Sequence, residues 1–186
     1  MTQISTLSRR RRDPNAEPPF QGWRTPQAIF DQLNIEECMG YGLDLFADRD
    51  NAKCDRYFTE MNSAFDNDWS LTAAHAFGNP PYSGRNQERA LAKAIHEVRV
   101  VRALDHVDLL MQASTATKWF YRALTECEVH LFRGRISFDV PPNMVNPDRP
   151  SFSNVLVRIS ADDPKRGLTA IRDCRTGRIV HSFGGQ

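Results

Sequence analysis

The sequence lacks an apolar run of the length that a membrane span requires, and the arginines near its start are not followed by the apolar segment of a secretory signal. We therefore expect neither a membrane-spanning helix nor a secretory signal. With 40% apolar and 25% charged residues in 186, the composition indicates one soluble globular domain with a real core. We expect a cytoplasmic location.

Cysteine is scarce, because the chain has four and none belongs to a C-x-x-C pair. Reduced thiols are therefore favoured over disulfides. The five histidines show no spacing typical of metal ligands either. The sequence predicts no zinc site and no other metal site.

Net charge is also small, at +1, so any surface that binds nucleic acid must be local. One dense basic run, Arg9, Arg10, Arg11 and Arg12, lies in a polar, proline-containing stretch over residues 1–20. That composition predicts a flexible arm. Two interpretations of its arginines stay open, a solvated tail and an arm that contacts phosphates.

The most distinctive stretch is Asn79-Pro80-Pro81-Tyr82. The carboxamide oxygen of Asn79 is an uncharged acceptor, and the two prolines hold the carbonyl of Pro80 in a fixed relation to it. Two convergent acceptors can bind both hydrogens of a planar amino group, while the ring of Tyr82 can stack on whatever carries that group. The stretch predicts a site for a nucleobase amine or a carboxamide, with a Pro-rich turn as the alternative.

Asn-Pro-Pro-Tyr is also the catalytic motif of amino-methyltransferases that use S-adenosylmethionine. From about Trp23 to about Ile159 the sequence resembles the phage-type DNA N6-adenine methyltransferases, the Dam-like group. The resemblance implies methyl transfer from S-adenosylmethionine to the N6 amine of adenine in double-stranded DNA, in a bacterial host cell, with GATC as a target suggested by the family alone. It also implies an α/β fold with a doubly wound mixed sheet of the class I, Rossmann-like type. The other stretches that carry it are Trp23-Arg24-Thr25-Pro26, residues 43–47, 51–54, 56–59, Asp68-Trp69, 118–120 and 132–138.

Periodicity predicts the elements of such a sheet. Thr25 as N-cap and Pro26 at the first position predict a helix. Two further helices are predicted, one with the apolar positions Leu91, Ala94, Ile95 and Val98, and one capped by Thr115 or Thr117. Strands are predicted over residues 41–47, 56–60, 73–77, 107–111, 129–132 and 153–159, the last two as an antiparallel pair, and a terminal hairpin over 168–173 and 178–183. The predicted organisation is an arm (1–20), a methyltransferase domain (21–160) and a C-terminal extension (161–186).

The resemblance places the chemistry on Asn79, Pro80, Pro81 and Tyr82, and the cofactor at the carboxyl end of the first strand. No G-x-G turn follows that strand, which leaves the backbone path around the methionine moiety open. Glu60 is either a ribose ligand or an exposed residue, and Asp68 either binds the cofactor's adenine or belongs to a turn before a core Trp. The cofactor candidates are Thr25, Pro26, Asp44, Phe46, Ala47, Glu60, Asp68 and Asn79.

We expect target readout to come from loops, because these 186 residues leave no room for a large recognition domain. The loop over residues 141–150 is one of these loops. The sequence does not indicate the oligomeric state, and a monomer stays open. Two other functions stay open: methylation of an RNA guanine or a protein glutamine, and a non-catalytic DNA-binding or interaction protein on this fold. The DNA-binding candidates are Ser83, Arg85, Arg133, Arg135 and the four arginines 9–12.

Overall fold

A computed structural model describes residues 22–37, 40–69, 74–83, 85–141, 151–162 and 165–183. The arginine run 9–12, with the rest of the predicted arm, and most of the loop 141–150 lie outside these residues. The elements are α1 (Gln27–Glu36), β1 (Leu43–Asp44), β2 (Arg56–Tyr57), β3 (His75–Gly78), α2 (Asn86–His96), the π-helix η1 (Glu97–Val101), β4 (His106–Gln112), α3 (Lys118–Glu126), β5 (Glu128–Arg133), β6 (Asn154–Ser160), β7 (Gly167–Asp173) and β8 (Ile179–Ser182).

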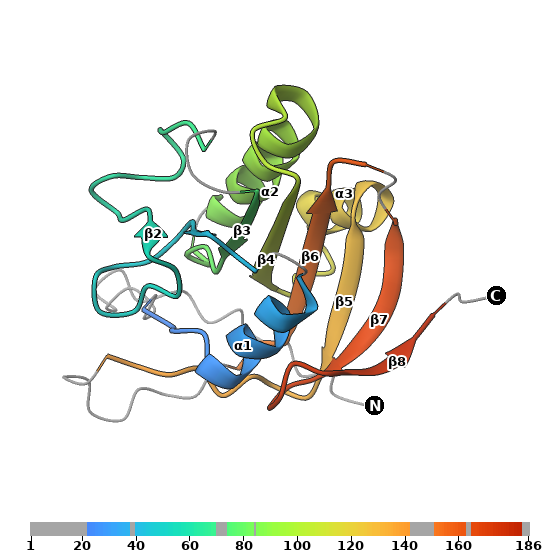
Figure 1. Cartoon of the computed structure of the whole chain (residues 1–186). Helices are drawn as coiled ribbons and strands as arrows, with labels where there is room; N and C mark the ends of the chain where they lie inside the picture. Colours follow the sequence, from blue (N-terminus) through green and yellow to red (C-terminus); the bar gives the residue numbers. More distant parts are fainter. Residues whose placement is uncertain are drawn as a thin grey trace, which may run out of the picture.

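The strands form one eight-stranded mixed sheet in the order β2-β1-β3-β4-β6-β5-β7-β8 (Figure 1). Strands β2, β1, β3 and β4 are parallel, and β6 is inserted antiparallel to both β4 and β5. This agrees with the predicted antiparallel pair. Strand β7 runs parallel to β5, and β8 returns antiparallel to β7, where the sequence predicts a hairpin.

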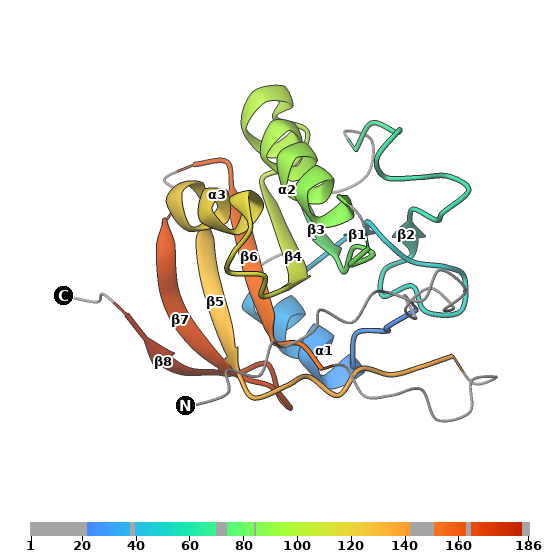
Figure 2. The ribbon, with the colours of Figure 1, turned by 180° about the vertical axis from the view of Figure 1, so that it is seen from behind.

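Helices cover both faces of the sheet because its central strands are apolar on both (Figures 1 and 2). Along β4, Leu110 packs with Ile29 and Leu33 of α1. Its neighbours in sequence, Leu109 and Met111, belong to the core on the other face, with residues of α2 and α3. The alternation follows from the pleat of a strand. The protein is therefore a mixed α/β fold with two hydrophobic cores, one on each face.

Two boundary predictions are wrong. The helix α1 begins at Gln27 with Pro26 as its N-cap, and no side chain caps it. The extended backbone of Pro26 presents its own carbonyl to the amides of Ile29 and Phe30, which leaves Thr25 one residue too early to cap. The first two strands are also shorter than predicted, at two residues each.

Other local predictions are confirmed. Thr117 caps α3 by accepting a bond from the amide of Phe120. Trp119 is 7% exposed and belongs to the core on the face covered by α2 and α3. The predicted stripe of α2 is buried, and the helix continues into η1, a π-helix that the pattern does not predict.

The carboxyl ends of β1, β3 and β4 form one edge of the sheet. This edge lies opposite the C-terminal end of α2 and η1 (Figure 1).

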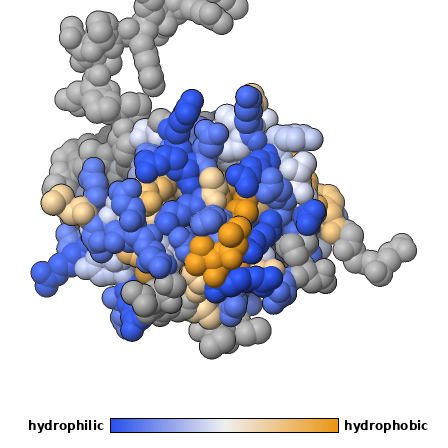
Figure 3. Space-filling model, turned by 90° about the horizontal axis from the view of Figure 1, so that it is seen from above, coloured by the Kyte–Doolittle hydropathy of each residue, from blue (hydrophilic) through white to orange (hydrophobic). Residues whose placement is uncertain are grey.

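Figure 3 shows the molecule from above, where hydrophobic residues gather in one small patch within a largely hydrophilic surface. A small apolar patch of this kind is ordinary on a monomer surface. No helix in the described ranges combines the length and apolar character needed to cross a membrane.

Candidate active site

Asn79 follows the last residue of β3 and is oriented by a residue far away in the sequence. Its Nδ2 donates to the backbone carbonyl of Trp23 at 2.8 Å. A carbonyl can only accept, so this contact fixes which end of the carboxamide is which. The opposite atom, Oδ1, is buried and has no hydrogen-bond partner among the described residues. An acceptor buried in this way costs about 1–3 kcal/mol, which makes it a candidate position for a ligand donor.

A cavity of about 20 Å³ lies beside this oxygen, between the carboxyl ends of β1 and β3. The chain passes from β1 to β2 on one side and returns to β3 on the other, so the cavity lies at the switch point of the strand order. Four predicted residues meet there: Thr25, Asp44, Phe46 and Asn79. The volume holds about one water molecule, and a larger ligand enters only if the lining segments separate.

Two more polar atoms near the cavity are buried without a partner in the described structure, Oγ1 of Thr25 and Nε of Arg24. The Arg24 guanidinium lies 3.9 Å from the carboxylate of Asp48. Sequence reasoning singled out the Thr25-Pro26 helix start but did not assign Arg24 a role. Donors and an acceptor around one cavity fit a polar, zwitterionic ligand better than an apolar one.

Asp44 ends β1 and is 3% exposed. Its carboxylate accepts backbone bonds from Lys53 at 3.0 Å and Phe46 at 3.3 Å. Burial raises the pKa of this carboxyl, although those backbone bonds oppose the rise. Gly78 is required here, because a Cβ at this position would lie 2.9 Å from the ring of Phe46. Close packing of β1 on β3 thus shapes the wall of the cavity.

The remaining cofactor candidates lie outside this lining. Pro26 caps α1, and the amide of Ala47 donates to the carbonyl of Phe58. Glu60 and Asp68 are exposed, in the segments that follow β2. Their predicted contacts with a cofactor therefore stay predictions.

Tyr82 is anchored at its hydroxyl, which donates to the carbonyl of Leu110 at 3.4 Å and accepts from Nδ2 of Asn154 at 3.1 Å. Its ring stands nearly perpendicular to those of Phe138 and Phe152, with centroids 6.4 and 5.1 Å away. Burial raises the pKa of the phenol well above its ordinary value, so the hydroxyl stays protonated. The sequence did not point to Asn154, which is 72 residues away.

The DNA-binding candidates lie on the surface. Ser83 and Arg85 are exposed just before α2, and Arg133 and Arg135 are exposed after β5. The segment after β5 returns to the site, because Asp139 and Arg24 exchange backbone hydrogen bonds of 2.9 Å. Arg133 and Arg135 are thereby connected to the residues that line the cavity.

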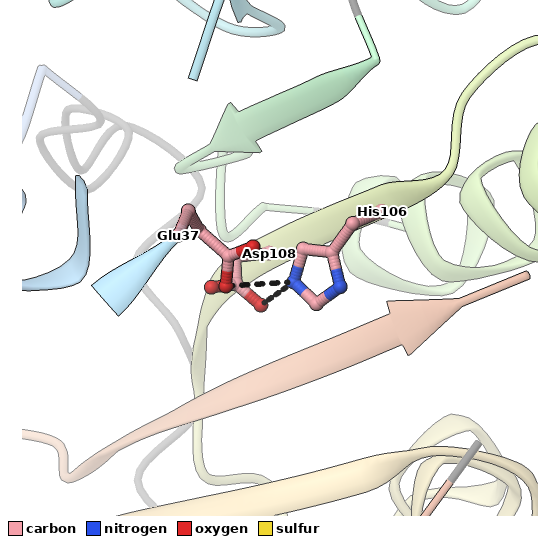
Figure 4. A group of neighbouring side chains, drawn as sticks. All are labelled: Glu37, His106 and Asp108. Atoms are coloured by element: carbon pink, nitrogen blue, oxygen red, sulfur yellow. Dashed lines mark hydrogen bonds and ion pairs between the residues drawn. The ribbon is translucent and has the colours of Figure 1, made fainter. Parts of the chain in front are cut away.

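A group that could hold a metal lies on the α1 face of the sheet, where Glu37, His106 and Asp108 converge (Figure 4). His106 Nε2 is 2.8 Å from Asp108 and 3.6 Å from Glu37. Sequence spacing missed this group because Glu37 is remote from the His-x-Asp pair. Burial alone would lower the pKa of His106, but the carboxylate of Asp108 reverses this and raises it.

The group already contains a cation. Arg158 donates to Asp108 at 3.0 Å and also to Glu37, while the hydroxyl of Tyr41 donates to Asp108. A metal ion would have to displace this guanidinium. We therefore interpret the group as an internal ion cluster that fixes the end of α1 on β4 and β6.

Comparison with known proteins identifies the family. The model of Dam, DNA N-6-adenine-methyltransferase, matches residues 17–169. The chain belongs to this family. The Escherichia coli (strain K12) protein named "Putative methyltransferase YfdM" is 49% identical over 65 residues, and the match covers 32% of this chain and 69% of that protein. No solved structure matches the chain. Family membership supports a DNA methyltransferase. The family match ends at residue 169, within β7.

Proposed function

We propose that this Dam-family protein transfers a methyl group from S-adenosylmethionine to the exocyclic N6 amine of adenine in double-stranded DNA. The observation that carries the proposal is the buried, unpartnered Oδ1 of Asn79 at the end of β3. The family description names this position of adenine, and the site offers the acceptor that an amino group needs.

The polar groups around the cavity suit the charged ends of the cofactor, which would enter once the lining segments separate. The unpartnered groups of Thr25 and Arg24 are donors that suit a carboxylate, and the buried Asp44 lies on the same cavity. When bound, S-adenosylmethionine supplies an activated sulfonium methyl. Because Asn79 lies on the same cavity, the methyl and the amine would meet beside its oxygen. Alignment of the reacting atoms can contribute about 7–11 kcal/mol in well-oriented models.

Asn79 and the carbonyl of Pro80 would accept the two hydrogens of the amine. An exocyclic amine is a poor nucleophile because its lone pair is delocalised into the ring. Acceptors on both hydrogens favour a tetrahedral nitrogen and return electron density to it. The orientation that Trp23 gives to Asn79 prepares Oδ1 for this role before substrate arrives.

Adenine inside a duplex cannot reach Asn79, so we propose that the target base is turned out of the helix at a cost of a few kcal/mol. Tyr82 would stack on it. Its hydroxyl bonds and the perpendicular rings of Phe138 and Phe152 hold the ring in one orientation. Held in this way, the ring loses little entropy when the base arrives.

The strand order supports the class I, Rossmann-like methyltransferase fold. The parallel strands β2, β1, β3 and β4 are followed by the antiparallel strand β6, which lies between β4 and β5. Helices cover both faces of this sheet. The chain departs from a regular doubly wound fold because the described parts of the β1–β2 and β2–β3 connections contain no helix.

The test is incubation with methyl-labelled S-adenosylmethionine and mixed-sequence duplex DNA, followed by nucleoside analysis and sequencing. The proposal expects label in N6-methyladenine at one short sequence. Label on RNA guanine or on protein would favour the other amino-methyltransferases that share the motif. No transfer to any substrate would favour a non-catalytic protein.

A further inference from the structure

The hairpin of β7 and β8 continues the edge of the sheet at which the candidate active site lies. Strand β7 is parallel to β5, which is parallel to β4 through their common antiparallel neighbour β6. The last residue of β5, Arg133, is in register with the last residue of β7, Asp173. The turn between β7 and β8 therefore emerges at the same edge as Asn79.

This turn packs against the Arg133-Gly134-Arg135 segment. The guanidinium of Arg133 lies 3.6 Å from the carboxylate of Asp173. Gly134 has a φ of 91°, and a Cβ there would lie 2.8 Å from Sγ of Cys174. Figures 1 and 2 both show the turn beside the segment that follows β5. The two turns form one continuous surface, which we call the arginine ridge (residues 133–135 and 173–178).

The hairpin turn is held by several hydrogen bonds and by packing on α1. Asp173 Oδ1 accepts from the amides of Arg175 and Thr176 at 3.0 Å, which lowers the pKa of its carboxyl. Gly177 packs on α1, since a Cβ there would lie 3.3 Å from the carbonyl oxygen of Ile29. The fully buried Arg172 donates to the carbonyl of Gly177 at 2.7 Å. The turn is thus fixed from inside, by α1 and by its own side chains.

Arginine side chains project from this fixed base. Arg133, Arg135, Arg175 and Arg178 are all exposed, Arg133 by 69% of its side chain. Within the described structure no carboxylate pairs with Arg135 or Arg175, and Arg178 bonds to the neutral Gln32 at 3.3 Å. The carboxylate of Asp173 is committed to the turn. Arg175 and Arg178, which have no carboxylate partner in the described structure, suit the evenly spaced charges of a nucleic acid backbone.

We propose that the hairpin turn, through Arg175 and Arg178, contacts the phosphate backbone of the DNA beside the target base. The inference rests on the proposed function, since it assumes that the duplex lies along the edge that holds Asn79. Four strand-to-strand steps separate β3 from β7, which is about 19 Å at about 4.8 Å each. With about 3.4 Å per base pair, the contact falls about five to six base pairs from the flipped adenine.

The test compares two double variants with the same change in charge. Arg175→Ala/Arg178→Ala removes the cations of the turn. Lys165→Ala/Arg166→Ala removes two exposed cations at the opposite end of β7, about 23 Å away along the strand. DNA affinity is measured by fluorescence anisotropy over a range of salt concentrations, on a long duplex and on one that ends about three base pairs from the target.

We expect the turn variant to bind the long duplex about tenfold more weakly or worse near 0.1 M salt, with a salt slope smaller by about one to two. On the short duplex it should match the wild type, and the control variant should match on both. Melting temperature and S-adenosylhomocysteine binding should stay unchanged in both variants. A turn variant with wild-type affinity and slope on the long duplex would overturn the inference, as would equal losses in both variants.

The two levels of failure are distinguishable. If the wild-type protein methylates DNA but the turn variant binds it normally, only the phosphate contact is wrong. If the wild-type protein neither binds nor methylates any duplex, the proposed function fails, and the inference with it.

Discussion

Asn79 and Trp23 are 56 residues apart, and a 2.8 Å bond from the Asn79 carboxamide to the Trp23 carbonyl joins the end of β3 to the segment before α1. The bond orients Oδ1 of Asn79 toward a cavity that the same segment lines with Thr25. One contact therefore couples the residue proposed for chemistry to residues proposed for cofactor binding.

Thr25→Val should weaken S-adenosylhomocysteine binding by about five- to tenfold without loss of stability. The variant keeps the shape of the side chain and removes a hydroxyl that is buried without a partner, so the free energy of unfolding should stay equal or rise. Calorimetry measures the affinity, and urea unfolding measures the stability. Unchanged affinity would remove Thr25 from the cofactor site, whereas a loss of stability would show that its hydroxyl has a structural partner.

Tyr82→Phe should retain methyl transfer but lose about 1 kcal/mol of stability, because Asn154 loses one of the acceptors of its amide while Met111 remains the other. Tyr82→Ala should cost a further 1–3 kcal/mol, roughly, in holding the flipped base. Single-turnover rates on a duplex with a mismatch at the target serve as control, since such a base is easier to extrude. Equal rates for Tyr82→Ala and wild type on matched DNA would exclude stacking by this ring.

Deletion of residues 1–20 should weaken DNA binding and reduce its salt slope, because the chain without the arginine run 9–12 neutralises fewer phosphates and releases fewer counterions. Methyl transfer at saturating DNA should survive. Anisotropy titrations of the truncated and full chains at several salt concentrations test this. An unchanged slope would make the arm a passive tail.

Glu128→Gln should destabilise the protein by about 2–3 kcal/mol at neutral pH. Burial alone would raise the pKa of Glu128, but hydrogen bonds from His130 and Thr169 lower it to about 2. Because the pKa of Glu128 is lower in the folded state than its ordinary value of 4.5, its ionised carboxylate stabilises the folded state above about pH 4.5. This stabilisation is lost as the pH falls from about 4.5 toward about 2.

Urea unfolding at pH 7 and near pH 3 measures this effect. The difference between wild type and Glu128→Gln should shrink to about half at the lower pH. Glu126→Gln is the control, since Glu126 forms an exposed pair with Arg122 and should change little at either pH. A difference that does not depend on pH would assign the loss to packing instead of charge.

The sequence predicted local structure best where the pattern of neighbouring residues determines it. The stripe of α2, the cap at Thr117 and the apolar runs of β4 and β6 follow from patterns among neighbouring residues alone. Strands β1 and β2 were overestimated because two-residue pairings depend on what packs beside them, such as Phe46 against Gly78.

Contacts between distant residues could not be predicted. Neither the partner of Asn79 at Trp23 nor the anchor of Tyr82 at Asn154 has a signature in sequence. The cluster of Glu37, His106, Asp108 and Arg158 gathers from α1's end, β4 and β6, which no spacing rule connects. The arginine ridge likewise depends on β7 pairing with β5, a strand order that periodicity does not give.

The central claim is that Oδ1 of Asn79 accepts a hydrogen bond from the amine in the transition state. Single-turnover methylation of an unmethylated duplex by wild type, Asn79→Ala and Asn79→Asp, with S-adenosylhomocysteine affinity measured in parallel, tests it most directly. We predict that Asn79→Ala abolishes transfer and leaves cofactor affinity nearly intact, because a bond made mainly in the transition state affects the rate. Asn79→Asp, which keeps an acceptor oxygen, should retain more activity than Asn79→Ala. Transfer by Asn79→Ala at the wild-type rate would contradict the account and leave Asn79-Pro80-Pro81-Tyr82 as a turn.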